Sequence, residues 1–162
     1  MGLFTRNEEQ VTVSPEQVLD ALRTVQDPDL HKDIVTLGFV KDVKVEGETV
    51  DFTIAPRDSV EYKYRLDKGK ALLYSWKATG PVNYELHAEP DGAPRGYAQS
   101  YEKGRGSSQA SGTLTAPFSG IHGWFWENTG DQEITVTLTT AGFYNMSHEF
   151  RRGAPVKNKI FQ

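Results

Sequence analysis

The sequence contains no cysteine among its 162 residues. This absence excludes disulfide bonds, thiolate zinc sites, cysteine-ligated iron–sulfur clusters and a cysteine nucleophile. No motif for another cofactor stands out, so we expect the chain to bind none. Redox chemistry therefore gives no indication of the compartment.

Long apolar runs and basic runs are also missing. No apolar stretch approaches the roughly 20 residues that span a bilayer, and the first ten residues lack the apolar core of a signal peptide. The net charge is −4 and the mean hydropathy is −0.55, with 37% hydrophobic residues. This balance is typical of a soluble globular protein and argues against a nucleic-acid partner or membrane insertion. As written, the chain is expected to be cytoplasmic, with one or two domains.

Residues 14–55 are predicted to form a helix followed by a β-hairpin, after a flexible segment at 1–13. Ser14 can cap the helix and Gln17 can close a capping box, with apolar residues following at helical spacing. Two alternating runs then flank a short turn at Glu46–Glu48, which predicts a hairpin. The two runs are Gly38–Val45 and Thr49–Ile54.

Residues 56–150 have the pattern of an antiparallel β-sandwich, because short alternating runs are separated by Gly, Pro and Asp. The fold class is therefore mainly β, with about seven to nine strands. Two stretches, Glu89–Gly96 and Lys103–Ser111, are predicted to be loops, and residues 151–162 a fraying tail. The predicted strands are Val60–Leu66, Ala71–Lys77, Val82–His87, Tyr97–Tyr101, Ser111–Thr115, Ile121–Asn128 and Glu133–Phe143.

The N-terminal segment resembles a known family. The stretches Val18–Leu22, Asp27–Leu30 and Asp33–Val40 resemble the first half of the iron–sulfur assembly domain found in front of bacterial Mrp-type ATPases. The resemblance covers residues 14–54 and implies a similar scaffold. The cluster-related cysteine of that family has no counterpart here, so cluster transfer cannot be carried over onto any residue.

The second part resembles a bacterial GOLD-type β-sandwich over residues 56–150. The resemblance rests on Leu73–Trp76, Gly80–Tyr84, His87–Gly92, Ser100–Gly104 and Gly120–Asn128. Such sandwiches are usually attached to a membrane anchor and face the periplasm, so the resemblance implies binding rather than catalysis. It also implies a periplasmic location if a leader or anchor is missing.

The two resemblances meet at Val50–Pro56, where either family could place a strand. The second strand of the hairpin can then double as the first strand of the sandwich. We hypothesise that the chain is a recombined or engineered chimera joined through this shared strand.

His87, Glu102 and His122 are residue types that a metal ion would choose, and each is next to an aromatic-rich strand. They lie far apart in sequence without the close pairing of a metal motif, so hydrogen-bonded structural roles are favoured over a metal site.

Tyr101, Trp124 and Trp126 are candidates for a platform that stacks on a sugar or a base. A role in the hydrophobic core is the favoured interpretation of the tryptophans. No order of residues typical of a hydrolase is present, and we expect no enzymatic activity.

The preferred function is a non-enzymatic binding or structural module that takes a protein partner or self-associates through exposed strand edges. The alternatives are an accessory protein of iron–sulfur cluster or metal assembly, and a carbohydrate-binding module that uses the aromatic face.

Overall fold

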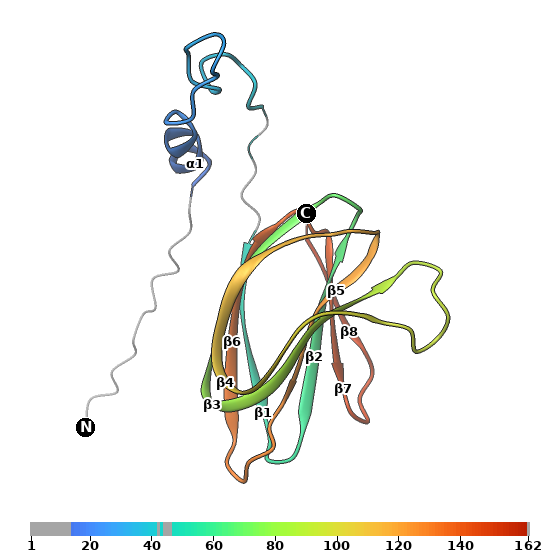
Figure 1. Cartoon of the computed structure of the whole chain (residues 1–162). Helices are drawn as coiled ribbons and strands as arrows, with labels where there is room; N and C mark the ends of the chain where they lie inside the picture. Colours follow the sequence, from blue (N-terminus) through green and yellow to red (C-terminus); the bar gives the residue numbers. More distant parts are fainter. Residues whose placement is uncertain (1–13, 42, 44–46, 162) are drawn as a thin grey trace, which may run out of the picture. The chain divides into compact units, whose positions relative to one another are not determined.

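The computed structural model describes residues 14–41, 43 and 47–161 (Figure 1). The chain divides into two compact units, residues 1–45 and residues 46–162. We call them the N-terminal unit and the β unit, and describe each by itself.

The N-terminal unit contains one helix, α1 (Pro15–Leu22), followed by hydrogen-bonded turns. The predicted capping box is confirmed: the Gln17 amide donates to Ser14 Oγ at 3.2 Å, and the Ser14 amide donates to Gln17 Oε1 at 2.8 Å. Proline at the first helical position fixes the backbone angle that the helix needs. Arg23 ends the helix as its C-cap.

The turns of this unit are held by two aspartates. Asp27 Oδ1 accepts the amides of Asp29 and Leu30, and Asp33 Oδ1 accepts the amides of Val35 and Thr36. These contacts are local, so they shape the chain without burying apolar surface. None of the described residues of this unit is buried.

The β unit consists of eight antiparallel strands that form one sheet. The strands are β1 (Gly47–Ile54), β2 (Ser59–Leu66), β3 (Ala71–Pro90), β4 (Gln99–Thr115), β5 (Gly120–Glu127), β6 (Ile134–Gly142), β7 (Met146–Arg151) and β8 (Lys157–Ile160).

The long hairpin of β3 and β4 organises the sheet, and Figure 1 shows it as a bent ribbon. The first half of β3, residues 72–78, pairs with β6, whereas its second half, residues 83–90, pairs with β5. Because register shifts lie between these halves, the ribbon bends there and the two sets of strands curl into a half-barrel. The full strand order is β1-β6-β3-β5-β2-β7-β8, with β4 beside β3.

The core of the β unit is aromatic. Trp124 and Trp126 stack with ring centroids 5.8 Å apart, and Trp76 meets Trp126 edge to face at 5.9 Å. Phe52 of β1 joins this group, 5.7 Å from Trp126 and 4.8 Å from Tyr62. Aromatic pairs in these geometries add to the free energy gained by burying their area.

The predicted mainly β, antiparallel class with one preceding helix is confirmed. The predicted hairpin is wrong: β1 pairs with β6, and the described residues of 38–43 form no strand. Residues 44 and 45 of that hairpin, and the predicted flexible segment 1–13, lie outside the described residues.

Two further expectations are corrected. Lys103–Ser111 is not a loop but the middle of β4, and the predicted tail holds the end of β7 and all of β8. The two runs predicted at 71–77 and 82–87 are halves of one strand, β3. A turn does follow β3 at residues 91–96, inside the other predicted loop.

Candidate functional site

The two ends of the strand order, β1 and β8, are edges of the curled sheet, and a cleft of about 380 Å³ lies between them. Among the described strands, β4 is also an edge, because it pairs with β3 alone. Because the sheet curls, strands from opposite ends of the order share this cleft. The lining residues are Glu48, Thr49, Val50, Asp51, Tyr62, Ser147, Glu149, Lys157, Asn158 and Lys159.

Alternate residues of β1 point their backbone groups away from β6. The Thr53 carbonyl points away from β6, because it accepts a hydrogen bond from Arg151 Nη1 of β7 at 2.8 Å. Residues two apart in a strand point their backbone groups to the same side, so those of Thr49 and Asp51 also point away from β6. In an antiparallel pair, facing residues that share no backbone hydrogen bonds have their side chains close together. The side-chain hydrogen bonds of Thr49 with Thr139 and of Thr137 with Asp51 agree with this arrangement.

Glu48 closes one end of the cleft. Its side chain is only 4% exposed, and Lys159 Nζ of β8 lies 2.7 Å from Glu48 Oε2. Glu48 Oε1 accepts hydrogen bonds from the hydroxyls of Tyr62 at 2.7 Å and Tyr64 at 2.6 Å. A buried carboxylate is tolerated because these donors compensate the loss of water.

Hydroxyl groups extend this network behind Glu48. Tyr62 lies 2.7 Å from Ser147 Oγ, and Thr140 Oγ1 donates to the Tyr64 hydroxyl at 2.9 Å. Burial, and then the nearby Glu48 charge, raise the pKa of both tyrosines well above the usual value. They are therefore neutral hydrogen-bond donors, and the network holds the edges of the sheet together.

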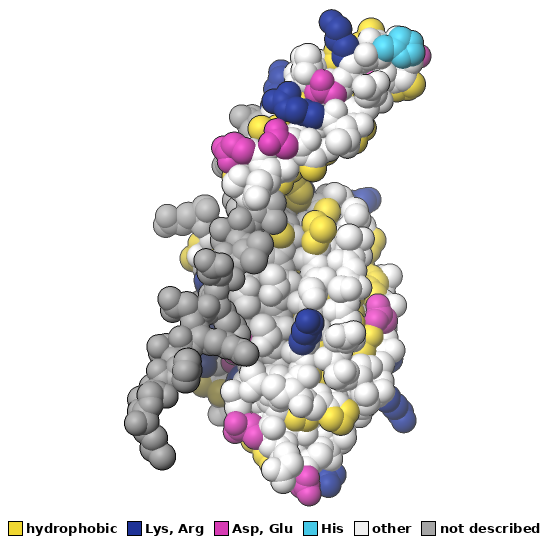
Figure 2. All heavy atoms as spheres, turned by 90° about the vertical axis from the view of Figure 1, so that its left-hand side faces the viewer, with side chains coloured by type: hydrophobic (Ala, Val, Ile, Leu, Met, Phe, Trp, Pro, Cys, Tyr) yellow, Lys and Arg dark blue, Asp and Glu magenta, His cyan; other side chains and the backbone are white. Residues whose placement is uncertain are grey.

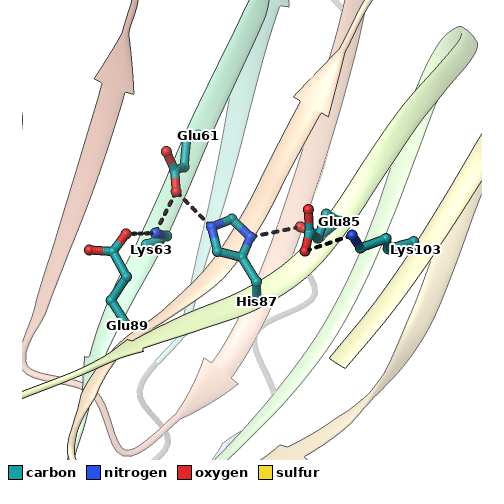
Figure 3. Close-up of polar contacts among 6 residues, drawn as sticks. All are labelled: Glu61, Lys63, Glu85, His87, Glu89 and Lys103. Atoms are coloured by element: carbon teal, nitrogen blue, oxygen red, sulfur yellow. Dashed lines mark hydrogen bonds and ion pairs between the residues drawn. The ribbon is translucent and has the colours of Figure 1, made fainter. Parts of the chain in front are cut away.

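A second cluster lies on the outer face of β2 and β3 (Figure 3). The Lys63 side chain is fully buried, with its ammonium group against the carboxylates of Glu61 and Glu89. His87 Nε2 lies 2.9 Å from Glu61, and Glu85 pairs with Lys103 at 3.4 Å. Burial acts to raise the pKa of Glu61, but hydrogen bonds from His87 and Lys63 outweigh it and leave the pKa below its usual value.

The three residues predicted for a metal site lie in different places. His87 belongs to the outer cluster, whereas the Glu102 carboxylate accepts from the Tyr84 hydroxyl. His122 is fully buried, with Nε2 3.1 Å from the Phe118 carbonyl and Nδ1 3.2 Å from the Tyr101 hydroxyl. Both of its ring nitrogens therefore have hydrogen-bond partners within the protein, as the structural interpretation expects. Burial lowers the pKa of His122.

The predicted aromatic platform is not on the surface. Trp124 and Trp126 have 0% exposure, so a sugar has no access to their rings, in agreement with the favoured core role. Tyr101 is half-buried and lies parallel to His122, with centroids 6.1 Å apart. Burial raises its pKa to about 12.

Charged side chains are sparse on one face of the β unit. Figure 2 shows this face, which carries β6 and β4 in Figure 1, mainly in the white of uncharged polar side chains and backbone. Lysine and arginine do not gather there as a nucleic-acid-binding face would require. Among the described residues, no helix is long and apolar enough to cross a membrane.

The comparison with known families matches the N-terminal part. A family model described as "Iron-sulfur cluster assembly protein" matches residues 15–59. An iron-sulfur cluster carrier protein from Synechocystis sp. is 45% identical over 42 residues, which make up 26% of this chain and 12% of that relative. The predicted resemblance of residues 14–54 is therefore confirmed, and the match is limited to a small part of the relative's length.

Two solved structures share a distant likeness with part of this chain. PliG of Aeromonas hydrophila, a periplasmic inhibitor of g-type lysozyme, is 15% identical with a TM-score of 0.43, covering 64% of this chain and 93% of its own. A de novo designed double-stranded β-helix is 13% identical with a TM-score of 0.34, covering 57% and 97%. Both TM-scores lie below 0.5, so neither likeness assigns an activity. The GOLD-type resemblance and the chimera hypothesis stay predictions.

The family match crosses from the N-terminal unit into the β unit. It ends at residue 59, so it includes all of β1, and β1 pairs along its whole length with β6. A strand from the iron–sulfur assembly segment thus forms an edge of the sheet of the β unit. This agrees with the expectation that a strand near Val50–Pro56 belongs to both parts.

Apart from His87, sequence reasoning missed the residues that build the two sites. Glu48 was interpreted as part of a turn, and Lys159 as part of a fraying tail. Lys63 and Glu61 lie in the predicted strand Val60–Leu66, which alone gives no indication of a buried cluster. The charge patterns Glu61-Lys63-Arg65 and Glu85-His87-Glu89 stand on strands that β5 separates, so the rule for pairs on neighbouring strands does not predict their contacts.

Proposed function

We propose that the β unit is a non-enzymatic binding module that accepts an extended segment of a protein partner along the free edge of β1. The observation that carries this proposal is the set of backbone groups at Thr49 and Asp51, which face the cleft instead of β6. An incoming strand would form main-chain hydrogen bonds with these groups, as in other cases of β-strand addition.

The dimensions and chemistry of the cleft suit a short extended segment. Its volume of about 380 Å³ lies within the range of ligand pockets, roughly 300–1,000 Å³. The Lys159–Glu48 and Arg151–Thr53 contacts lie on either side of residues 49–52 of β1, so four residues of this strand lie between the two contacts. Lysines of β8 and acidic groups of β1 and β7 line it, which supports a partner with polar side chains flanking alternate apolar ones.

A defined peptide tests the proposal. The probe is the β6 sequence ITVTLTTAG, residues 134–142, labelled for fluorescence polarisation, because β6 already pairs with β1 in antiparallel register. In the full chain, Asp51→Pro removes an edge-facing N–H without touching the β6 ladder, since proline is tolerated on the free side of an edge strand. We expect Asp51→Pro to weaken peptide binding by at least about tenfold, the loss of one good hydrogen bond to a bound chain.

The matched control is Asp51→Ala, which removes the carboxylate but keeps the N–H and is expected to bind within about twofold of the original chain. Amide exchange at Thr49 and Asp51 should slow when the peptide is bound. Equal binding by the proline variant, or no slowing of these two amides at millimolar peptide, contradicts the proposal.

The family match favours a second candidate function for the N-terminal unit, as an accessory in iron–sulfur cluster assembly. Residues 15–59 match that family, and the apolar residues of α1 are only half-buried. Because the chain has no cysteine, a partner would have to supply the thiolate ligands of any cluster. We therefore propose that α1 contacts an iron–sulfur cluster carrier protein through its apolar side.

Purified cluster carrier protein is the probe for this candidate. Leu22→Asp places a charge on the apolar side of α1 and is expected to reduce the affinity of the full chain by at least about tenfold. Asp20→Asn, whose side chain is 80% exposed, is the control and should leave affinity unchanged. Undetectable binding, or equal affinity for the Leu22 variant, rules this candidate out.

A further inference from the structure

Three metal-ligating side chains converge on the outer face of the β unit. One carboxylate oxygen each of Glu61 and Glu89 and one ring nitrogen of His87 lie within 4.8 Å of one another. Glu61 comes from β2 and the other two from β3, with β5 between them. Gly123 of β5 stands opposite both Lys63 and His87, so no side chain rises between the two strands at this level.

The surroundings of His87 orient its ring. Nδ1 lies 3.4 Å from the Glu85 carbonyl, and Nε2 lies 2.9 Å from Glu61 Oε1 (Figure 3). Both ring nitrogens of His87 face oxygen acceptors. Because neutral imidazole carries a single N–H, only one of the two nitrogens can then donate a hydrogen bond. When Nδ1–H donates to the carbonyl, the lone pair of Nε2 points into the cluster. A backbone carbonyl behind one histidine nitrogen is the arrangement that orients metal-binding histidines.

Lys63 supplies the positive charge that the cluster requires. Its side chain has 0% exposure, and its ammonium group contacts both Glu61 and Glu89. Two carboxylates and an imidazole nitrogen thus surround one buried cation. Removing that cation leaves uncompensated carboxylates, which is unfavourable unless another cation takes its place.

We propose that Glu61, His87 and Glu89 form a binding site for a first-row divalent transition metal such as Zn²⁺ or Co²⁺, and that the Lys63 ammonium group competes with the metal for this site. One imidazole and two carboxylates are a ligand set that Zn²⁺ accepts, whereas Ca²⁺ and Mg²⁺ favour oxygen ligands alone. The site uses none of the residues that line the cleft, so it goes beyond the proposed function.

Cobalt titration tests the competition. In the full chain, Lys63→Met removes the competing charge and keeps an unbranched side chain of similar length. We expect it to bind Co²⁺ at least about tenfold more tightly than the original chain, read from calorimetry and from the d–d absorption of the bound ion. Adding His87→Ala should abolish the gain, whereas adding His31→Ala, in the N-terminal unit, should not change it.

The original chain provides a measurement that does not depend on a substitution at Lys63. Millimolar Co²⁺ should shift or broaden the NMR signals of residues 61, 87 and 89 through its unpaired electrons, and His87→Ala should remove the effect. Equal affinities for the original chain and the Lys63→Met variant overturn the proposal. So does the absence of an effect on these signals that depends on His87.

Discussion

The two units of the chain differ in what holds them together. The N-terminal unit is organised by caps and turns, with no buried residue among those described, whereas the β unit buries Trp76, Trp124 and Trp126 almost completely. Local hydrogen bonds fix the direction of a chain, but apolar burial provides most of the free energy of folding. The N-terminal unit therefore has the local caps and turns of a folded domain, but no buried core among its described residues.

The strand β1 complicates this comparison, because it belongs to the segment that matches the iron–sulfur assembly family but contributes to the core of the β unit. Phe52 and Ile54 are 1% and 0% exposed, and Glu48 joins the hydroxyl network. The family boundary and the physical boundary thus lie about a dozen residues apart. The predictions below test where the physical boundary lies and how unequal the two units are.

The largest expected effect is the difference in stability between two truncated chains. Removing residues 1–55 deletes β1, and the loss of Phe52 and Ile54 alone costs about 1.5–3 kcal/mol each. With the tyrosines of the network left without Glu48, the total approaches the whole stability of a typical domain, about 5–15 kcal/mol. We expect this truncation to be unfolded by circular dichroism.

The matched truncation removes residues 1–45 and keeps β1. Its melting temperature should stay within about 4 °C of the full chain, a change of about 1 kcal/mol or less for a domain of this size. If both truncations fold, or if both unfold, the boundary at residue 45 is not the physical one.

A pair of substitutions compares the two interiors. Trp126→Ala removes a ring that contacts Phe52, Trp76 and Trp124, and should lower the free energy of unfolding by about 3–5 kcal/mol. Leu22→Ala in α1 should lower the free energy of unfolding by less than about 1 kcal/mol, because the Leu22 side chain is only half-buried and little buried apolar area is lost. Urea unfolding of the full chain measures both, followed by tryptophan fluorescence for the β unit and by the helical circular dichroism signal for α1. Similar losses at the two positions would show that the N-terminal unit is also packed.

Glu48 and Lys159 join the sheet edges, and we expect their substitutions to lower the free energy of unfolding by different amounts. Glu48→Gln removes the charge that three donors share inside the protein, and should cost about 1.5–3 kcal/mol, the range for a hydrogen bond to a charged group. Lys159→Ala should cost no more than about 1 kcal/mol, since the lysine side chain is 58% exposed and water replaces it. Guanidinium unfolding measures both variants, and a larger loss for Lys159→Ala would mean that the ion pair, rather than the tyrosines, joins the edges.

The sequence predicted the features that depend on neighbours in the chain. The capping box at Ser14 and the alternation of Ile134 and Val136 with threonines are local patterns, and the structure has both. The strand β4 was missed because its glycines and serines are typical of a loop. Their reason is non-local: a Cβ on Gly104 would come within 2.2 Å of the Tyr84 ring, and one on Gly112 within 2.9 Å of the Tyr74 hydroxyl.

Apart from His87, the residues of the two candidate sites were missed for a related reason. Glu48 and Lys159 are 111 residues apart, and only the curl of the sheet brings its two edges together. Lys63 and Glu89 are 26 residues apart on strands that β5 separates. Charged residues of these types are common on exposed strand faces, so their spacing in sequence does not distinguish a buried cluster from a solvated surface.

The smallest effect expected concerns pH and distinguishes histidines of the two units. Burial lowers the pKa of His122 below its ordinary value of 6.5, so the unfolded chain binds a proton more readily than the folded one as the pH falls below that value. The stability that the neutral His122 contributes is therefore complete above pH 6.5 and declines on acidification. Melting temperatures of the full chain between pH 7.5 and pH 5.5 should fall more steeply than those of His122→Gln, while His31→Gln in the N-terminal unit should follow the original curve. Parallel curves for all three proteins would mean that His122 takes up its proton as readily in the folded chain as in the unfolded one, and that the core admits charge at this position.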